Sequence, residues 1–354
     1  MQQFAPKAGF MEAPRTPSTS YPRRRRQSTT LKDIAAETGF SISTVSRALA
    51  HNPVIPESTR TIVAETAKRL NYRPNAQAKA LRNQKTNLIG VLLPNICNPY
   101  FNTLAFEIQQ AARAKGYSTI LSNTDESPSV LNGALDTMNS QQVDGIIVVP
   151  HIQSAEKITE LANAGVPIVA ADRSVLGSSV PSVTSDPLPA MKEAIRLLSL
   201  NNHAKIGYLA GPQDTSTGRV RLEAITSIKE DLRIPSPDVY FGGYHYDAGR
   251  AGTLELLDRG VNSILTGDMM MAVGALSAIY SRKLKIGKDV ALIGFDNAAV
   301  FTLQESPLTV IDQQVETIGQ KAFELLYSIM KNDTMPDSVV VPTVLKVRDS
   351  HTLT

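Results

Sequence analysis

Residues 30–50 read TLKDIAAETGFSISTVSRALA, and this stretch predicts two short helices joined by a tight turn. Apolar residues around Ile34 recur at the spacing of one helix face. Glycine is the residue type that most often follows a helix, and Gly39 stands at the end of the first one. Ser41 is a favoured N-cap for the next helix. The second helix buries Val45, so the side chains two positions to either side of Val45 are expected to point outward.

A third helix is expected to start near Pro56 and to pack on the first two. Two helices joined by a glycine-containing turn, with a third in support, form a helix-turn-helix head, a unit that often reads DNA. We assign this head to residues 28–71. Small three-helix domains without a DNA partner are also common, so the pattern alone leaves the function of the head open.

The charge distribution favours DNA binding. Residues 1–82 hold 14 Lys and Arg against 5 Asp and Glu, whereas the remainder holds 22 against 28. A basic region on an acidic body suggests that the basic part meets a polyanion. Residues 1–27 lack hydrophobic periodicity and are rich in Pro, Ser, Gln and Arg, so they are predicted to be a disordered basic tail.

Residues 72–86 predict a hinge helix and linker. Pro74 suits a first helical turn, and the alanines of YRPNAQAKAL (72–81) are good helix formers. An isolated helix of this length is marginal in water, so a partner is needed to hold it.

From residue 87 onward, strands and amphipathic helices alternate. This rhythm predicts parallel sheets that are covered by helices on both faces. Two sets of four strands indicate two similar doubly wound subdomains that face a cleft. The expected strands are 88–94, 117–123, 145–150, 167–172, 205–211, 239–243, 263–268 and 290–296.

Motifs of common enzymes are missing from this body. It has no P-loop, no dinucleotide-binding glycine pattern and no nucleophile elbow, and the five histidines lack metal-ligand spacing. We therefore expect a protein that is not an enzyme and uses no cofactor or metal. No apolar run reaches 18 residues, no signal sequence is recognisable, and Cys97 is the only cysteine, which together predict a cytoplasmic protein without a membrane span.

Loops after the carboxyl ends of parallel strands form binding crevices. Carboxylates, guanidinium groups and an amide beside aromatic rings suit a neutral polyol, because charged groups bind hydroxyls directionally and rings stack on sugar C–H faces. The polar and aromatic residues at these strand ends are Asn98, Tyr100, Phe101, Asp172, Arg173, Arg219, Arg221, Tyr246, Asp268, Asp296 and Gln313.

Residues 30 to about 348 resemble the lactose/galactose repressor family of bacterial transcription regulators. The resemblance rests on the helix-turn-helix stretch, on YRPNAQAKAL, and on the body motifs NPYF (98–101), GDMMMAVGAL (267–276) and ALIGFD (291–296). It implies a homodimer whose two heads read the half-sites of a pseudo-palindromic, double-stranded DNA operator. A ligand in the cleft then alters the affinity for DNA.

The resemblance also implies an α/β body of two doubly wound parallel-sheet subdomains, like that of periplasmic binding proteins, behind an all-α head. We assign the body to residues 87–348. Its N-subdomain then comprises about 87–187 and 314–340, and its C-subdomain comprises about 188–313 and 341–348.

Roles of single residues follow from the same resemblance. In the head, Ile42, Ser43 and Arg47 match base-reading positions, whereas Thr30, Ser41, Thr44 and Tyr72 match phosphate contacts. In the hinge, Leu81 matches a side chain that wedges into the minor groove, and Asn75, Ala78 and Lys79 are expected to contact DNA. The ligand-binding set is Asn98, Tyr100, Phe101, Asp172, Arg173, Arg219, Tyr246, Asp296 and Gln313.

This ligand set is most similar to that of ribose repressors, which implies ribose or a related pentose as effector. Purine-binding members carry an arginine where this chain has Thr215, which argues against a purine. Gly267 replaces the usual asparagine before Asp268, and we expect this to remove an amide contact and to leave room for a water or a larger substituent. A ribonucleoside therefore stays open, as do a phosphoprotein corepressor and, less favoured, a sugar-transport role.

Overall fold

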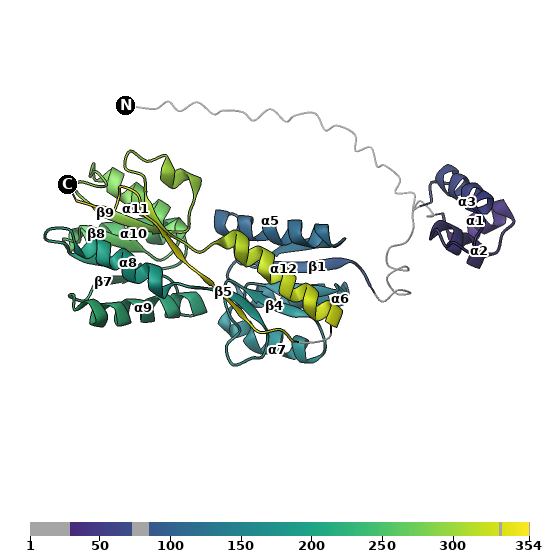
Figure 1. Cartoon of the computed structure of the whole chain (residues 1–354), viewed down its shortest axis with the longest axis horizontal. Helices are drawn as coiled ribbons and strands as arrows, with labels where there is room; N and C mark the ends of the chain where they lie inside the picture. Colours follow the sequence, from purple (N-terminus) through teal and green to yellow (C-terminus); the bar gives the residue numbers. More distant parts are fainter. Residues whose placement is uncertain (1–28, 73–84, 333–334, 354) are drawn as a thin grey trace, which may run out of the picture. The chain divides into compact units, whose positions relative to one another are not determined.

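A computed structural model describes residues 29–72, 85–332 and 335–353. Contacts divide the chain into two compact units, residues 1–79 and 80–354. Figure 1 draws the described helices and strands of both units. The predicted disordered tail lies outside the described residues. So does most of the predicted hinge helix, including Asn75, Ala78, Lys79 and Leu81.

The head contains the three predicted helices, which are α1 (Leu31–Thr38), α2 (Ile42–Leu49) and α3 (Glu57–Arg69). Gly39 follows α1 in the left-handed conformation (φ +74°), which a residue without a Cβ adopts without strain. The fully or nearly fully buried side chains of this unit are Ile34, Val45, Ala48, Ile55, Val63 and Ala67.

The first sheet of the body has six parallel strands in the order β11-β5-β4-β3-β1-β2. Its core is built from the Ile- and Val-rich runs expected of strands buried on both faces. The strands are β1 (Leu88–Leu93), β2 (Ser118–Asn123), β3 (Gly145–Val148), β4 (Ile168–Ala171), β5 (Ser182–Asp186) and β11 (Val339–Pro342).

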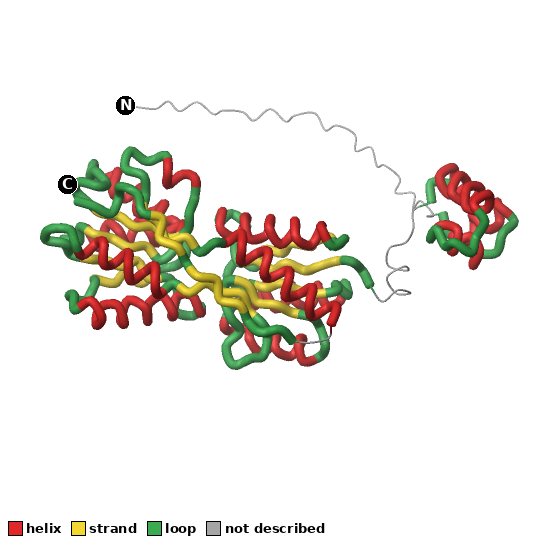
Figure 2. The backbone as a smooth tube through the Cα atoms, in the orientation of Figure 1, coloured by secondary structure: helices red, strands yellow, loops and turns green. Residues whose placement is uncertain are grey.

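Helices cover both faces of this sheet (Figure 2). One face buries α5 (Pro99–Ala114) and α12 (Val315–Asn332), which also pack on each other. The other face buries α6 (Pro128–Ser140) and α7 (Ala155–Asn163), the latter preceded by the short 3₁₀ helix η1 (Ile152–Ser154).

The second sheet repeats this order as β12-β10-β9-β8-β6-β7, and only its β12 runs antiparallel to its neighbour. Its strands are β6 (Ile206–Ala210), β7 (Asp238–Phe241), β8 (Ser263–Thr266), β9 (Ala291–Phe295), β10 (Thr309–Asp312) and β12 (Val344–Lys346). Its helices are α8 (Leu188–Ser199) and α9 (Ser216–Leu232) on one face, and α10 (Tyr246–Asp258) and α11 (Met269–Ser281) on the other. A 3₁₀ helix, η2 (Ala299–Thr302), follows β9.

The two-subdomain architecture of the prediction is confirmed, but the prediction of four strands in each subdomain is wrong. It omitted β5, β10, β11 and β12. These strands have five residues or fewer, and β11 and β12 are edge strands that are partly exposed. Length alone does not explain the omission, because the predicted strands β3, β4 and β8 also have only four residues, and β10 is buried like them.

The chain crosses between the two sheets three times, after β5, after β10 and after β11. Contacts of the second sheet also extend past residue 348, the predicted end of the body. The Ser350 side chain is buried and its hydroxyl donates to the Leu292 carbonyl at 2.5 Å, while the Leu353 amide donates to Asn201 Oδ1 at 3.0 Å. In the described ranges, no helix is long and apolar enough to cross a bilayer.

Candidate functional site

The start of α2 forms an outward-facing surface on the head. The Ser41 hydroxyl accepts the Thr44 amide at 3.1 Å and so caps the helix. Ser43 and Arg47 are exposed, as their spacing from Val45 predicted, and Ile42 is 44% exposed. Hydroxyls, a guanidinium and an apolar side chain thus share the helix face that projects from the head.

Arg47 lies back along its own helix, where its Nε donates to the Ser43 carbonyl at 3.3 Å. Two of the predicted phosphate contacts also have partners inside the head. The Thr30 hydroxyl and amide both donate to Asp33 Oδ2, at 2.9 and 2.7 Å, and these bonds hold the pKa of Asp33 below its usual value. Tyr72 packs against the apolar core, and burial raises its pKa.

In the body, the carboxyl ends of strands from both sheets meet at one polar pocket. Seven of the nine residues predicted to bind ligand line it, namely Asn98, Tyr100, Phe101, Asp172, Arg173, Asp296 and Gln313, together with Thr217, Arg221, Tyr244 and Asp268. The side chains nearly fill it and leave a cavity of about 20 Å³, which is space for about one water.

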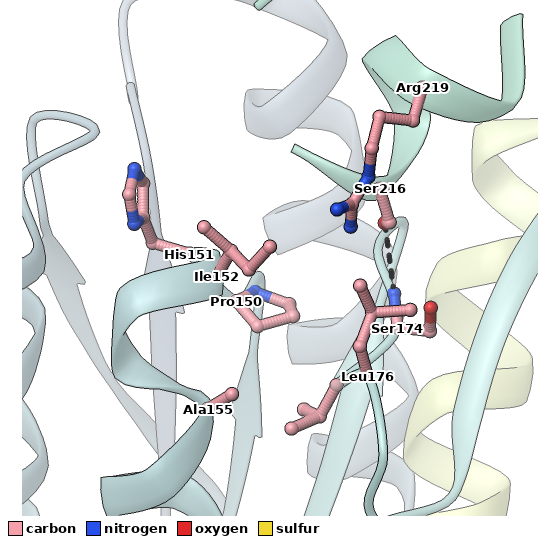
Figure 3. A pocket seen from close by; sticks show the side chains of 9 residues that line it. Pro150, His151, Ile152, Ala155, Ser174, Leu176, Ser216 and Arg219 are labelled. Atoms are coloured by element: carbon pink, nitrogen blue, oxygen red, sulfur yellow. Dashed lines mark hydrogen bonds between the residues drawn. The ribbon is translucent and has the colours of Figure 1, made fainter. Parts of the chain in front are cut away.

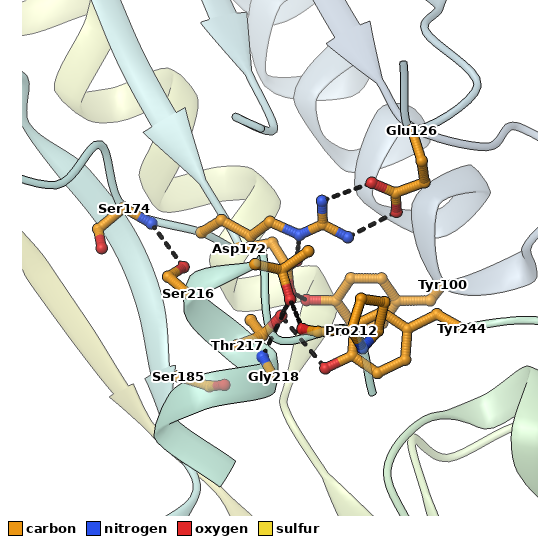
Figure 4. Close-up of polar contacts among 12 residues, drawn as sticks. Tyr100, Glu126, Asp172, Ser174, Ser185, Pro212, Ser216, Thr217, Gly218 and Tyr244 are labelled. Atoms are coloured by element: carbon orange, nitrogen blue, oxygen red, sulfur yellow. Dashed lines mark hydrogen bonds and ion pairs between the residues drawn. The ribbon is translucent and has the colours of Figure 1, made fainter. Parts of the chain in front are cut away.

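On the side of the first sheet, Tyr100 and Asp172 face the pocket (Figure 4). The Tyr100 hydroxyl donates to Asp172 Oδ1 at 2.7 Å, and burial raises the pKa of this phenol well above its usual value. The guanidinium of Arg173 forms a bidentate pair with Glu126 at 2.6 and 2.7 Å, while its buried Nε lacks a hydrogen-bond partner. This Nε lies 3.7 Å from Asp172 Oδ2, so Arg173 also pairs with the carboxylate that binds Tyr100.

On the side of the second sheet, Arg221 begins a chain of hydrogen bonds. Its Nη1 donates to the Gly267 carbonyl at 2.6 Å and its Nη2 to Gln313 Oε1 at 2.7 Å. Gln313 Nε2 in turn donates to Asp296 Oδ1 at 2.6 Å. The guanidinium also lies 4.1 Å from the ring centroid of Phe295, a cation–π geometry that fixes its plane.

Two carboxyl groups of this half are held near neutrality by burial. Burial raises the pKa of Asp268 to about 6, against the amides of Met271 and Met270 that favour the charged form. Burial raises the pKa of Asp296 to about 7, against the nearby Arg221. Asp268 also caps α11 by accepting the Met271 amide at 2.8 Å. The pocket therefore offers both hydrogen-bond donors and acceptors, which suits hydroxyl groups.

Arg219 does not belong to the polar pocket. It lines a separate small hollow with His151, Ser174 and Ser216 (Figure 3), and Arg221 takes the place that was predicted for it. The spacing on α9 could have revealed this, because Thr217 and Arg221 are four residues apart on one helix face, whereas Arg219 points about 200° away from both.

Tyr246 is likewise outside the pocket, with its hydroxyl bonded to Ser277 Oγ at 2.6 Å between α10 and α11. The ring that faces the pocket is Tyr244, which sits before the N-cap of α10, with its hydroxyl 3.4 Å from Thr217 Oγ1. No pattern in the sequence separates these two tyrosines, because the turn between β7 and α10 sets their directions.

The expectation that Gly267 leaves room for a substituent is wrong. A Cβ at this position would lie 2.5 Å from the backbone carbonyl oxygen of Leu209 and 3.3 Å from the Gly211 amide nitrogen. The space beside Gly267 is therefore occupied by the end of β6. Glycine is needed here because two backbone segments approach closely.

Two family profiles match the chain. The profile described as periplasmic binding proteins and sugar binding domain of LacI family matches residues 86–349, and the one described as bacterial regulatory proteins, lacI family, matches residues 30–75.

Individual relatives match along most of the chain. It is 33% identical to catabolite control protein A of Priestia megaterium, over 91% of this chain and 98% of that protein. It is 28% identical to the ribose operon repressor of Escherichia coli K12, over 86% of this chain and 94% of that protein. A crystal structure of the lac repressor dimer bound to operator and the anti-inducer ONPF aligns with a TM-score of 0.82 at 25% identity, over 92% of this chain and 100% of that chain.

Proposed function

The chain belongs to the LacI family of bacterial regulatory proteins, and from this we propose that it is an operator-binding repressor whose DNA affinity is set by a pentose in the cleft. Membership makes it a DNA-binding transcription regulator with a sugar-binding type of body. The observation that supports the pentose is the polar pocket between the two sheets, which presents carboxyl, amide, guanidinium and phenol groups to one small space.

DNA binding is assigned to the exposed face at the start of α2. We propose that Ile42, Ser43 and Arg47 read base edges in the major groove, after Arg47 leaves the Ser43 carbonyl. Thr30, Ser41, Thr44 and Tyr72 are proposed to contact phosphates, and Leu81 of the hinge to wedge into the minor groove at the operator centre. The two heads of a homodimer would read the two half-sites.

Replacing Arg47 tests this assignment. Operator sequences are first selected from random duplex DNA with the full-length protein, and binding is then measured by fluorescence anisotropy. Arg47→Ala is expected to weaken binding to the selected sequence about 10- to 100-fold, since a bidentate contact to guanine contributes ~1–3 kcal/mol. Arg69→Ala, which removes an exposed arginine paired with Glu37 on the same unit, is the matched control. Equal losses on selected and random DNA would remove Arg47 from base reading.

The effector is tested by thermal denaturation with D-ribose, other pentoses, hexoses, adenosine and purines. A ligand at 100 times its Kd stabilises by about 2.7 kcal/mol, which shifts the melting temperature measurably. We expect a shift with ribose or a related pentose, and loss of that shift in Arg221→Met but not in Arg219→Met. A response to purines alone would overturn the pentose assignment.

A second candidate effector is a phosphoprotein corepressor. It is favoured by the small volume that the cleft side chains leave. Absence of any sugar-dependent shift, together with tighter operator binding in the presence of a cell extract and its loss after phosphatase treatment, would favour this alternative.

We further propose that the protein acts in the cytoplasm, where its operator lies, and that it binds its effector without converting it. The relatives named above are regulators, and in the described residues no group of three or more His, Cys, Asp or Glu could hold a metal ion. Recovery of unchanged sugar after prolonged incubation with the protein is the expected result.

A further inference from the structure

A second cavity, which we call the distal hollow, lies at the amino-terminal edge of the second sheet. It forms where α10 and α11 end, and Val261 and Val290 in its wall come just before β8 and β9. The polar pocket is at the opposite, carboxyl-terminal edge and shares no described lining residue with it. The distal hollow has a volume of about 330 Å³ and is lined by Leu257, Asp258, Gly260, Val261, Arg282, Leu284, Asp289 and Val290.

The floor of the distal hollow is apolar. Val261 and Val290 are buried, and the half-buried Leu257 and Leu284 pack against the same core cluster. Binding cavities in proteins typically measure about 300–1,000 Å³, so this one is at the small end of that range. Its size and its floor suit one large apolar side chain.

The two carboxyl groups in the wall already have partners. Asp258 accepts Arg282 Nη2 at 2.7 Å, and Asp289 accepts the backbone amide of Lys285 at 2.8 Å. A cation that entered the distal hollow would therefore have to compete with existing bonds. The wall does not select a cation, and the apolar floor remains its main feature.

A basic patch, formed by Lys283, Lys285 and Lys288, borders the distal hollow. All three side chains are exposed, and among the described residues none of their ammonium groups has a hydrogen-bond or ion-pair partner. The stretch RKLKIGKD (282–289) holds four of the 22 Lys and Arg of residues 83–354, but only one of the 28 Asp and Glu. The basic patch is therefore a local concentration of positive charge on an acidic body, which attracts acidic groups.

The end of α11 accounts for only part of this charge. Cations are favourable near a helix C-terminus, and α11 ends at Ser281, so Arg282 and Lys283 stand where they stabilise the helix. Lys285 and Lys288 lie further along the chain, beyond the last turn. Their charge has no such structural reason.

A rigid turn carries Lys285 and Lys288. The Gly287 amide donates to the Val290 carbonyl at 3.0 Å, and the Asp289 amide donates to the Lys285 carbonyl at 2.8 Å. The side chain of Ile286 is buried beneath the turn. Because the backbone is already ordered, a partner that binds here loses little free energy to ordering it.

The combination of charge and apolar floor favours a protein partner over a nucleic acid. A phosphate backbone has no apolar group to place in the distal hollow, and it would approach the carboxyl groups of Asp258 and Asp289. An acidic protein segment can direct its carboxylates to the lysines and insert an apolar side chain between them. An apolar anchor in a pocket with a polar rim is the usual composition of a protein interface.

We propose that the distal hollow and the basic patch bind an acidic segment of a partner protein. One large apolar side chain of that segment occupies the distal hollow, and its Asp or Glu side chains pair with Lys283, Lys285 and Lys288. The inference goes beyond the proposed function, because the site shares no residue with the DNA-binding surface or the polar pocket. A partner bound here leaves both of those surfaces free.

The first experiment selects phage-displayed random peptides of about 12 residues on the full-length protein. A parallel selection uses the variant Lys283→Glu, Lys285→Glu, Lys288→Glu. Peptides enriched on the original protein but not on the variant are expected to be acidic and to contain at least one Leu, Met, Phe or Trp. If no acidic peptide with an apolar residue is enriched in this way, the proposal is wrong.

The second experiment titrates a selected peptide, labelled with fluorescein, and follows its anisotropy. The original protein is expected to bind it about tenfold or more tightly than the triple variant, and less tightly as the salt concentration rises. Replacing the apolar residue of the peptide by alanine should also weaken binding about tenfold or more, because the anchor of the interface is lost. An alanine peptide that binds as well as the original would remove the distal hollow from the interface.

The charge-matched control reverses three exposed lysines elsewhere on the body, as Lys321→Glu, Lys331→Glu, Lys346→Glu. It should bind the peptide like the original protein, and both triple variants should keep operator affinity. Should the first triple variant fail to fold, glutamine at the same three positions removes the charge without reversing it. Equal peptide binding by the original protein and this neutral variant would contradict the proposal.

Duplex DNA of random sequence tests the other class of partner. The proposal predicts that reversing Lys283, Lys285 and Lys288 leaves its binding unchanged. A tenfold loss of affinity for this DNA, with no peptide selected, would make the basic patch a nucleic-acid surface and would overturn the proposal.

Discussion

Asp172 and Asp296 occupy equivalent positions in the two sheets, and their surroundings differ. Each follows the fourth strand of its subdomain with φ +64°, and each donates its amide to the next strand at 2.8 Å, to Val183 and Ile311 respectively. The same left-handed turn therefore directs both carboxyl groups into the cleft. Asp172 binds a phenol and Asp296 binds an amide.

The difference lies in where the partners are anchored. The Tyr100 partner of Asp172 comes from the same subdomain, so opening of the cleft leaves that bond intact. Asp296 is held by Gln313 at the second crossing, whose Oε1 also accepts Ser185 Oγ from the other subdomain. On the first-sheet side of the pocket, the hydrogen bond of Asp172 is therefore independent of cleft opening. On the second-sheet side, the hydrogen bonds around Asp296 depend on how the two subdomains are placed.

Removing Arg221, the cation on the second-sheet side of the pocket, should produce the largest loss of stability. Arg221→Met leaves Asp296 and Asp268 without their guanidinium and deprives Gln313 of a donor. We expect the free energy of unfolding at pH 7.5 to fall by about 3 kcal/mol, because the buried Gly267 carbonyl and Gln313 Oε1 lose a charged donor and the carboxyl groups lose a nearby positive charge. Arg219→Met should cost less than about 0.5 kcal/mol. Urea denaturation of both variants measures this, and similar losses would contradict the assignment of Arg221 to the pocket.

Replacing either aspartate by alanine should abolish the response to effector. Each variant loses a hydrogen bond from a carboxyl group to the sugar, and we expect its affinity for the effector sugar to fall about 100-fold, or roughly 2.7 kcal/mol. Operator binding without effector should be unchanged, because neither residue belongs to the head. Calorimetry and anisotropy measure the two properties. A normal response in Asp296→Ala would remove this residue from the site.

The two sides of the pocket should also differ in how their contribution to stability depends on pH. The folded-state pKa of Asp296, about 7, is higher than the 3.8 of the unfolded chain, so between these values the folded protein binds the extra proton. Stability from this group is therefore lost as pH rises from about 4 to about 7, on the order of 2–3 kcal/mol between pH 5 and pH 8. Asp268, with a pKa of about 6, adds to the same trend.

Asp296→Asn should flatten this part of the profile and should be more stable than the original protein at pH 8. The measurement is urea unfolding at pH 5 and pH 8, and the difference between the two proteins cancels the contribution of the histidines. An unchanged slope would show that Asp296 is ionised throughout.

The smallest effect is expected for Tyr100→Phe. It removes the hydrogen bond to Asp172 and leaves the ring in place, which should cost about 1 kcal/mol of stability. Because this bond lies within one subdomain, the variant should keep the pH profile of the original protein. A changed profile in the same denaturation experiment would show that the two halves are coupled through Tyr100.

The parts that sequence reasoning found are those with a periodic signal. Helices of the head, the inner strands and the carboxyl groups at strand ends all follow from apolar spacing and from the rule that parallel strands end at one edge. The parts that it missed depend on contacts distant in the chain. The four short strands are recognisable only from their neighbours, and the space beside Gly267 is set by β6.

The sequence alone could have identified Arg221, and not Arg219, as the arginine that lines the pocket. Once Thr215 is recognised as an N-cap, helical spacing assigns Arg221 to the face of Thr217. The two tyrosines after β7 were not separable in this way, because both lie at the boundary of a turn. Only the backbone directions in that turn bring Tyr244, and not Tyr246, to the pocket.

The three crossings between the sheets also govern how the body can be made. The first sheet needs β11 at its edge and α12 on its face, and the second sheet needs β10 and β12, all of which belong to residues 309–346. During synthesis, neither half can therefore complete its core until nearly the whole chain has emerged. Until then, both sheets are incomplete and have unpaired edge strands. The two sides of the pocket are therefore completed at the same stage of synthesis.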